Sequence, residues 1–241
     1  MNSFEERKTP QFWYRYIGIP RRFWTMEWDD VDVREGIKDA YDNARELDHR
    51  LAVDGNPTGE GLTLVGPPGR GKTMLAALLA RSQFDRNHRP QSPLELMENE
   101  ALQVRFLTVR SYQRMLHQSL ELSRLIDNAP SLRDELLRPW TDAKRELEIV
   151  QREARLLVLD DIGKEHQTSS GHIEGALEEL IRERFDLGLT TVITTNLALT
   201  EFHTVYTPSL SSYLYESSAV IPVQGEDERA ERRSKEAHAC C

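Results

Sequence analysis

The sequence predicts an α/β fold in which a parallel sheet of about five strands is flanked by helices. Short apolar runs alternate along the chain with segments whose hydrophobic residues recur at helical spacing, which is typical of a parallel sheet. One run, 156–159, is apolar throughout, as expected of a strand that is buried on both faces. A glycine-rich loop joins the first run to the helix after it. The expected strands are 62–65, 104–109, 156–159, 191–195 and 219–223.

Helices are expected before and between these strands. The first, 33–53, carries hydrophobic residues at helical spacing, and the turn-forming stretch 54–61 separates it from the first strand. Further helices are expected from 74 to about 84, at 110–127, at 131–153 with a split at Pro139, and at 171–186, which is amphipathic.

The composition limits the class of protein. The chain has 241 residues, enough for one sizeable α/β domain with short appendages. Its formal net charge of −9 excludes a general nucleic-acid coat protein, so any DNA contact must come from a local basic patch. No apolar run approaches the roughly 20 residues of a membrane span, and the N-terminus lacks an apolar signal core. We therefore expect a cytoplasmic protein without membrane contact. The two cysteines, Cys240 and Cys241, have no distant partner with which to cross-link the fold.

Three regions are expected along the chain. Residues 1–35 form an extension that is dense in aromatic residues, either a partner-binding segment or a cap on the core. Residues 36–225 form the α/β domain, with little or no lid after the last strand. Residues 226–241 form a charged tail, which such a charge run predicts to be disordered.

The glycine-rich loop fits the phosphate-binding pattern G-x-x-x-x-G-K-[ST], with a strand before it and a helix after it. Its glycines let backbone N–H groups point inward, and the helix N-terminus adds partial positive charge. We expect the Lys72 ammonium to bind the β- and γ-phosphates of ATP and the Thr73 hydroxyl to bind Mg²⁺. A plain Gly/Pro turn is the alternative. The expected nucleotide-binding residues are Gly66, Pro67, Pro68, Gly69, Arg70, Gly71, Lys72, Thr73 and Met74.

Two carboxylates follow the apolar run 156–159. A carboxylate at the carboxyl end of a buried strand lies at the edge where open α/β sheets bind ligands. We expect Asp160 to hold Mg²⁺ and Asp161 to orient the attacking water, in the manner of a Walker B element. Asn196 ends the next strand, and we expect its amide to contact both the γ-phosphate and that water. An acidic turn and an Asn turn are the alternatives.

Together these elements resemble a known family. The segments GPPGRGKT, LLVLDDIG and TTVITTN, in that order and spacing, resemble the AAA+ ATPases of the DnaC/IstB group, which are replicative-helicase loaders and transposition helper ATPases. The segment GIPRRFWTMEWDDVD resembles an Ile-Pro-x-Arg-Phe element that precedes the ATPase core of the loaders. The likeness runs from about Gly18 to Arg229. The short DnaC-like proteins of bacteriophages are the most similar members, in LDDIGKE and in a late GED-x-R run.

The resemblance implies a P-loop AAA+ core that binds and hydrolyses ATP between subunits of a homo-oligomer. It also implies single-stranded DNA inside that assembly and a DnaB-type replicative helicase as partner. Ile19 and Pro20 would then lie against adenine, although burial in the core is an equal alternative for an apolar pair. Basic residues beside an aromatic ring suit single-stranded DNA, while a solvated helix face is the alternative. The DNA candidates are Arg105, Arg110, Tyr112, Arg114 and His117.

The chain departs from the family at one point. Ring ATPases insert an arginine from the neighbouring subunit, yet no Lys or Arg occurs from Asp186 through Glu228. We therefore expect slow turnover. The remaining candidates for that arginine are Arg182, Arg184, Arg229, Arg232 and Arg233.

Other functions stay open. An IstB-like transposition helper would need a transposase and duplex DNA, and the GIPRRF element argues against it. A small-molecule kinase would need an Arg-rich lid, against which the Arg-free stretch argues. A nucleotide-gated binding module with negligible turnover is compatible with the missing arginine.

Overall fold

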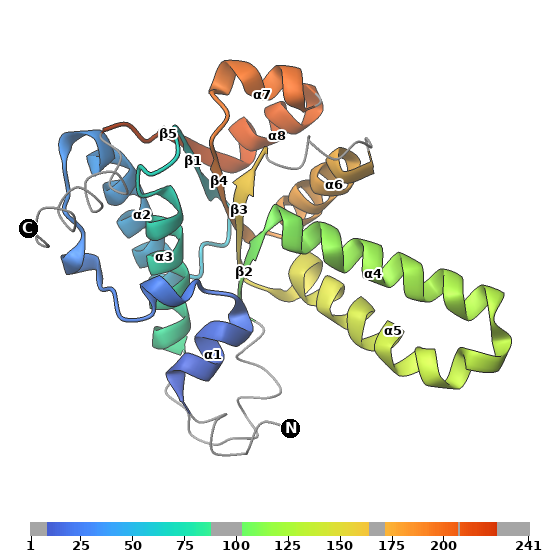
Figure 1. Ribbon diagram of the computed structural model, residues 1–241. Helices are drawn as coiled ribbons and strands as arrows, with labels where there is room; N and C mark the ends of the chain where they lie inside the picture. The colour runs from blue at the N-terminus through green and yellow to red at the C-terminus, as the bar shows by residue number, and fades with distance from the viewer. Residues whose placement is uncertain (1–8, 88–102, 164–171, 207, 226–241) are drawn as a thin grey trace, which may run out of the picture.

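The computed structural model describes residues 9–87, 103–163, 172–206 and 208–225. Its sheet has five strands in the order β2-β3-β4-β1-β5, and every pairing is parallel. Figure 1 shows this sheet flanked by helices, which confirms the predicted fold class. The strands are β1 (Gly61–Val65), β2 (Val104–Thr108), β3 (Leu156–Ile162), β4 (Thr190–Thr195) and β5 (Ser218–Pro222).

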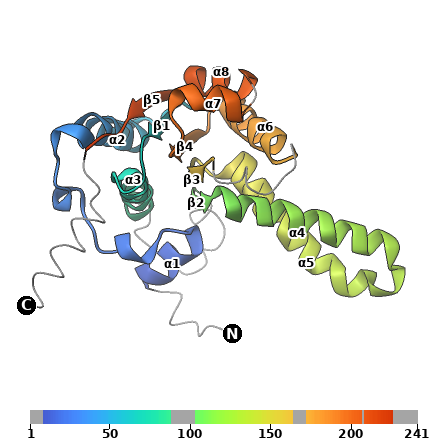
Figure 2. The same cartoon turned by 45° about the horizontal axis from the view of Figure 1, so that its top comes forward.

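The pleat of β3 separates two hydrophobic clusters. Val158 lies in one cluster, with apolar residues of α2 (Glu35–Val53) and α3 (Lys72–Asn87). Leu159, the next residue, lies in the other cluster, because successive strand residues point to opposite faces. The strand is therefore buried on both faces, as its unbroken apolar run predicts. Figures 1 and 2 show α2 and α3 on one side of the sheet; on the other side are α6 (His172–Asp186), α7 (Leu199–Val205) and α8 (Pro208–Ser217).

A helical hairpin projects from the β2 edge of the sheet (Figures 1 and 2). The expected split at Pro139 is wrong, because the second arm continues through this proline. Pro139 is exposed, so the carbonyl that loses its helical partner at Glu135 can bond to water instead. The parts of the hairpin are α4 (Val109–Asn128), the 3-10 turn η5 (Pro130–Leu132), α5 (Arg133–Glu148) and the π-helical turn η6 (Ile149–Glu153).

The aromatic segment that precedes the sheet folds against α3. Three of its aromatic side chains are buried in the cluster that contains the α3 side chains: Tyr14, Phe23 and Trp28. These three residues therefore form part of the core. Tyr16 stays 46% exposed. A partner-binding role for the segment stays a prediction. Its helices, which the sequence did not predict, are α1 (Pro10–Ile17), η2 (Arg21–Phe23) and η3 (Trp28–Asp30).

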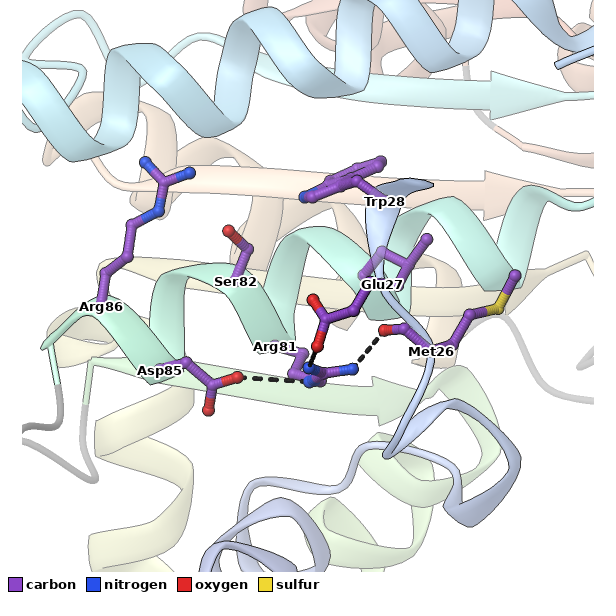
Figure 3. Close-up of a pocket in the computed structure, with 8 residues that line it drawn as sticks. Met26, Glu27, Trp28, Arg81, Ser82, Asp85 and Arg86 are labelled. Carbon is purple, nitrogen blue, oxygen red and sulfur yellow. Dashed lines mark hydrogen bonds and ion pairs between the residues drawn. The ribbon is translucent and has the colours of Figure 1, made fainter. Parts of the chain in front are cut away.

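Arg81 of α3 fastens this segment to the helix. Its guanidinium donates to the Met26 carbonyl and pairs with the carboxylates of Glu27 and Asp85 (Figure 3). A cavity of about 410 Å³ opens between the segment and the C-terminal half of α3. It is therefore remote from the phosphate loop, which lies at the other end of α3. None of the described helices combines the length and apolar character that a membrane span requires.

Candidate nucleotide site

The phosphate loop connects β1 to α3, as the sequence predicts. Gly69 and Gly71 have φ angles of 81° and 87°, in the left-handed region that glycine enters without a Cβ clash. Gly66 allows a close approach, since a Cβ there would lie 2.1 Å from the Val223 carbonyl oxygen. The curled backbone leads directly into the first turn of α3, which begins at Lys72. This arrangement presents backbone N–H groups and a helix N-terminus to an anion.

The Lys72 ammonium joins the loop to the end of β4. Its Nζ donates to the carbonyl oxygens of Gly66 and Pro67, at 2.6 and 2.7 Å, and to the Asn196 Oδ1 at 2.9 Å. The side chain is 5% exposed, so these bonds hold a largely desolvated charge. A phosphate oxygen that entered the loop would compete with the two carbonyl oxygens for this ammonium.

Asp160 connects α3 to β4 through hydrogen bonds. Its Oδ1 accepts from the Thr73 hydroxyl at 2.9 Å and from the Thr194 hydroxyl at 2.6 Å. Mg²⁺ takes hard oxygen ligands and is usually held by one or two carboxylates together with substrate phosphates. A threonine hydroxyl and a carboxylate at this separation therefore fit Mg²⁺ beside a bound triphosphate.

Asp161 is held in an unusual backbone conformation. Its φ is 66°, a left-handed value that costs free energy for a residue with a side chain. The pairing of β3 with β4 shifts register at this point, and the Thr194 hydroxyl accepts from the Asp161 N–H at 3.0 Å. The Asn196 amide donates to the Asp161 Oδ1 at 3.3 Å. The strained residue thus lies at an irregularity within β3, where its carboxylate faces the Asn196 amide.

The structure brings five of the predicted residues together: Lys72, Thr73, Asp160, Asp161 and Asn196. They meet because β1, β4 and β3 are neighbours in a parallel sheet, so their carboxyl ends lie at one edge.

Thr194 completes this group, and sequence reasoning did not identify it. It lies within a run of β-branched residues, where any one of them could have been an ordinary strand residue. Only the pairing of β3 with β4 shows that Thr194 faces the two aspartates.

Ile19 packs in the hydrophobic core. Ile19 is 3% exposed, its carbonyl accepts from the Trp24 indole, and its amide donates to the Tyr14 carbonyl. The Tyr14 ring contacts Phe84, near the C-terminal end of α3 and three turns from the phosphate loop. Ile19 is therefore a core residue, which was the alternative for this pair, and we do not assign it an adenine contact. Met74 is also buried in the core cluster.

Another segment lies beside the start of the phosphate loop. The Gln224 amide donates to the Gly36 carbonyl at 2.9 Å, and a Cβ on Gly36 would come within 2.6 Å of the Gln224 carbonyl oxygen. This contact holds the entry to α2 against the chain that leaves β5, next to Gly66. Val33, which precedes the first residue of α2 by two positions, is 42% exposed. No sequence motif marks these residues, because the contact joins segments almost two hundred positions apart.

Arg184 is a structural residue. It is fully buried and donates to the carbonyls of Val150, Ala154 and Thr190 and to the Thr191 hydroxyl. Burial lowers the pKa of Arg184 to about 9, which leaves the guanidinium protonated at neutral pH. Because all these contacts lie inside one chain, Arg184 is excluded as an arginine offered to a neighbouring subunit.

Replacing Arg184 with methionine should destabilise the fold by about 3 kcal/mol, because four buried acceptors lose their donor. Urea denaturation measures this loss. Arg182→Met is the matched control, because Arg182 is exposed and lies over the Tyr213 ring at 5.3 Å. An Arg184→Met protein with unchanged stability but lower ATPase activity would contradict the structural role.

The predicted DNA candidates divide into two groups. Arg105 is 3% exposed, lies 3.7 Å from Glu146 and is therefore engaged in the fold. Tyr112 is 1% exposed and packs in the core. Neither side chain can stack on or pair with a DNA strand as placed. The exposed members of the set are Arg110, Arg114 and His117, all on α4.

Several solved structures share this architecture. A crystal structure of the DnaC helicase loader has a TM-score of 0.59 and 21% identity, covering 85% of this chain and 100% of that chain. DnaI has a TM-score of 0.59 and 20% identity, covering 86% of this chain and 95% of its own. The replication initiator DnaA bound to AMPPCP and single-stranded DNA has a TM-score of 0.57 and 13% identity. That match covers 87% of this chain and 52% of DnaA. No family profile and no curated protein sequence matches the chain. The chain therefore shares the fold of the DnaC helicase loader and of DnaI.

Proposed function

We propose that this protein binds ATP with Mg²⁺ at the phosphate loop and hydrolyses it slowly. The observation that carries the proposal is the group of Lys72, Thr73, Asp160, Asp161 and Asn196 at one edge of the sheet. A cation, a hydroxyl, two carboxylates and an amide around a curled backbone are the parts that phosphoryl transfer to water needs.

Each residue has a distinct task in this proposal. The Lys72 ammonium moves from the loop carbonyls to the β- and γ-phosphates. Thr73 and Asp160 hold Mg²⁺, which offsets phosphate charge when bound. Asp161 accepts a hydrogen bond from the attacking water and polarises it, while Asn196 positions that water against the γ-phosphate.

The adenine base would lie beside the contact between the start of α2 and the chain that follows β5. Val33 offers exposed apolar surface there, against which a base could pack. This assignment replaces the expected adenine contact of Ile19, whereas the contact of Pro20 stays a prediction.

We propose that the protein uses ATP to load or remodel a DnaB-type replicative helicase on single-stranded DNA in the bacterial cytoplasm. The similar structures include helicase loaders and an initiator bound to single-stranded DNA, and the GIPRRF element points to the same branch. We propose that the ATP-bound protein forms homo-oligomers. Single-stranded DNA would then contact the exposed basic residues of α4.

A pull-down with a DnaB-type replicative helicase tests this function. We expect ATP to change the amount of helicase retained by at least about tenfold, since a ligand shifts an equilibrium only by its differential affinity. The Lys72→Ala protein should give the same retention with and without ATP. Retention that responds to neither ATP nor Lys72 would contradict the loader mechanism.

A nucleotide-gated module is the second candidate. The absence of Lys and Arg from 187 to 228 supports it, because few cations remain to stabilise the transition state from a neighbouring subunit. Single-turnover measurement separates the two. A loader that consumes ATP releases phosphate, and a gated module retains intact ATP.

A further inference from the structure

Arg70 occupies a variable position of the phosphate loop, between Gly69 and Gly71. Two atoms of its guanidinium group, Nε and Nη1, are buried and have no hydrogen-bond partner in the described part of the protein. The residue itself is partly buried. The general pattern for phosphate loops places no demand on this side chain, because the loop binds phosphate through its backbone and its lysine.

Other arginines in which a buried nitrogen makes no hydrogen bond provide a comparison. Arg50 has such an Nε, but its guanidinium pairs with Glu60 at 2.8 Å. Arg105 has such an Nη2, but its guanidinium lies 3.7 Å from Glu146. Each of these two charges has a carboxylate beside it. Within the described ranges, no ion pair or hydrogen bond gives Arg70 an equivalent anion.

Two buried guanidinium nitrogens without a hydrogen bond carry a desolvation cost, and an anionic ligand that accepts from them would offset it. The ligand must be an anion that comes close to the loop. If the loop backbone cradles a triphosphate, the side chain of the same loop is long enough to reach its oxygens. The planar guanidinium can donate two parallel hydrogen bonds to them.

We propose that the Arg70 guanidinium contacts the triphosphate directly and supplies, within the same chain, positive charge that ring ATPases take from a neighbouring subunit. This inference rests on the proposed ATP binding. Two observations support this role. The chain has no Lys or Arg from 187 to 228, and the Arg184 guanidinium donates to buried backbone carbonyls of its own chain.

The test uses the 241-residue protein with Arg70→Gln and Arg70→Lys, and Arg138→Gln as the matched control. Arg138 is exposed on α5. We expect Arg70→Gln to weaken ATP binding about tenfold and to lower kcat by a further factor of about ten or more, as loss of a charged hydrogen bond predicts. Arg70→Lys keeps the charge and should recover part of both losses. AMP binding should not change.

The controls separate the possible failures. Thermal unfolding without nucleotide checks for loss of the folded state. Arg70→Gln should be at least as stable as the parent there, because two buried nitrogens without hydrogen bonds are removed. An Arg70→Gln protein that binds and hydrolyses ATP like the parent would overturn the inference, as would equal losses for ATP and AMP. If Lys72→Ala also leaves ATP binding unchanged, the proposed function itself fails. If Lys72→Ala loses binding and Arg70→Gln does not, only the role of Arg70 fails.

Discussion

Replacing Lys72 with alanine is expected to weaken ATP binding by about 100-fold or more. The ammonium is nearly buried and gathers two loop carbonyls and the Asn196 side chain. Its removal deletes the charge that would meet the β- and γ-phosphates. Charge-assisted hydrogen bonds contribute about 1.5–3 kcal/mol each, and about 2.7 kcal/mol corresponds to 100-fold in affinity.

Titration calorimetry with ATP and Mg²⁺ measures this effect. Lys38→Ala is the matched control, since Lys38 is an exposed lysine on α2 that pairs with Asp42. The control should bind ATP like the parent protein. ATP affinity within threefold of the parent in Lys72→Ala, with the fold intact, would show that the triphosphate is not held by this loop.

Replacing Asp161 with asparagine is expected to lower kcat by about 10²–10³ while leaving ATP affinity within about threefold. The change keeps the shape of the side chain and removes the charge that polarises water. The contact from Asn196 survives in a weaker form, because an amide oxygen can still accept it. Phosphate release under single-turnover conditions measures the loss, with affinity measured separately.

Asp160→Asn provides the contrast to Asp161→Asn. Asp160 is placed beside Thr73, so its replacement should raise the Mg²⁺ concentration needed for ATP binding, whereas Asp161→Asn should not. Equal effects of the two substitutions on Mg²⁺ dependence would contradict the division of roles. An unchanged kcat in Asp161→Asn would remove Asp161 from the mechanism.

The parts of the fold that were predictable from the sequence share one property. Strands such as 156–159 are buried on both faces and flank a motif with fixed geometry, so composition alone marks them. The order of the strands was not predictable, because a parallel pairing joins residues far apart in the chain. Helices α1 and α7 are only eight and seven residues long, too short for a clear period.

The residues of the site also divide into those that a local sequence pattern predicts and those that only the tertiary structure places. Lys72 and Thr73 follow from a local pattern, whereas Thr194 acquires its position only when β4 lies beside β3. Arg105 and Tyr112 show the opposite case. Their residue types suit DNA, but burial decides their availability, and burial is a property of the tertiary structure.

The most direct test of the central claim is a crystal structure of the Asp161→Asn protein with ATP and Mg²⁺, in which slow turnover preserves the triphosphate. The account predicts that the Lys72 ammonium leaves the carbonyls of Gly66 and Pro67 for the β- and γ-phosphates, with the metal bound by the Thr73 hydroxyl beside Asp160. A nucleotide bound elsewhere, with Lys72 still on those two carbonyls, would contradict it.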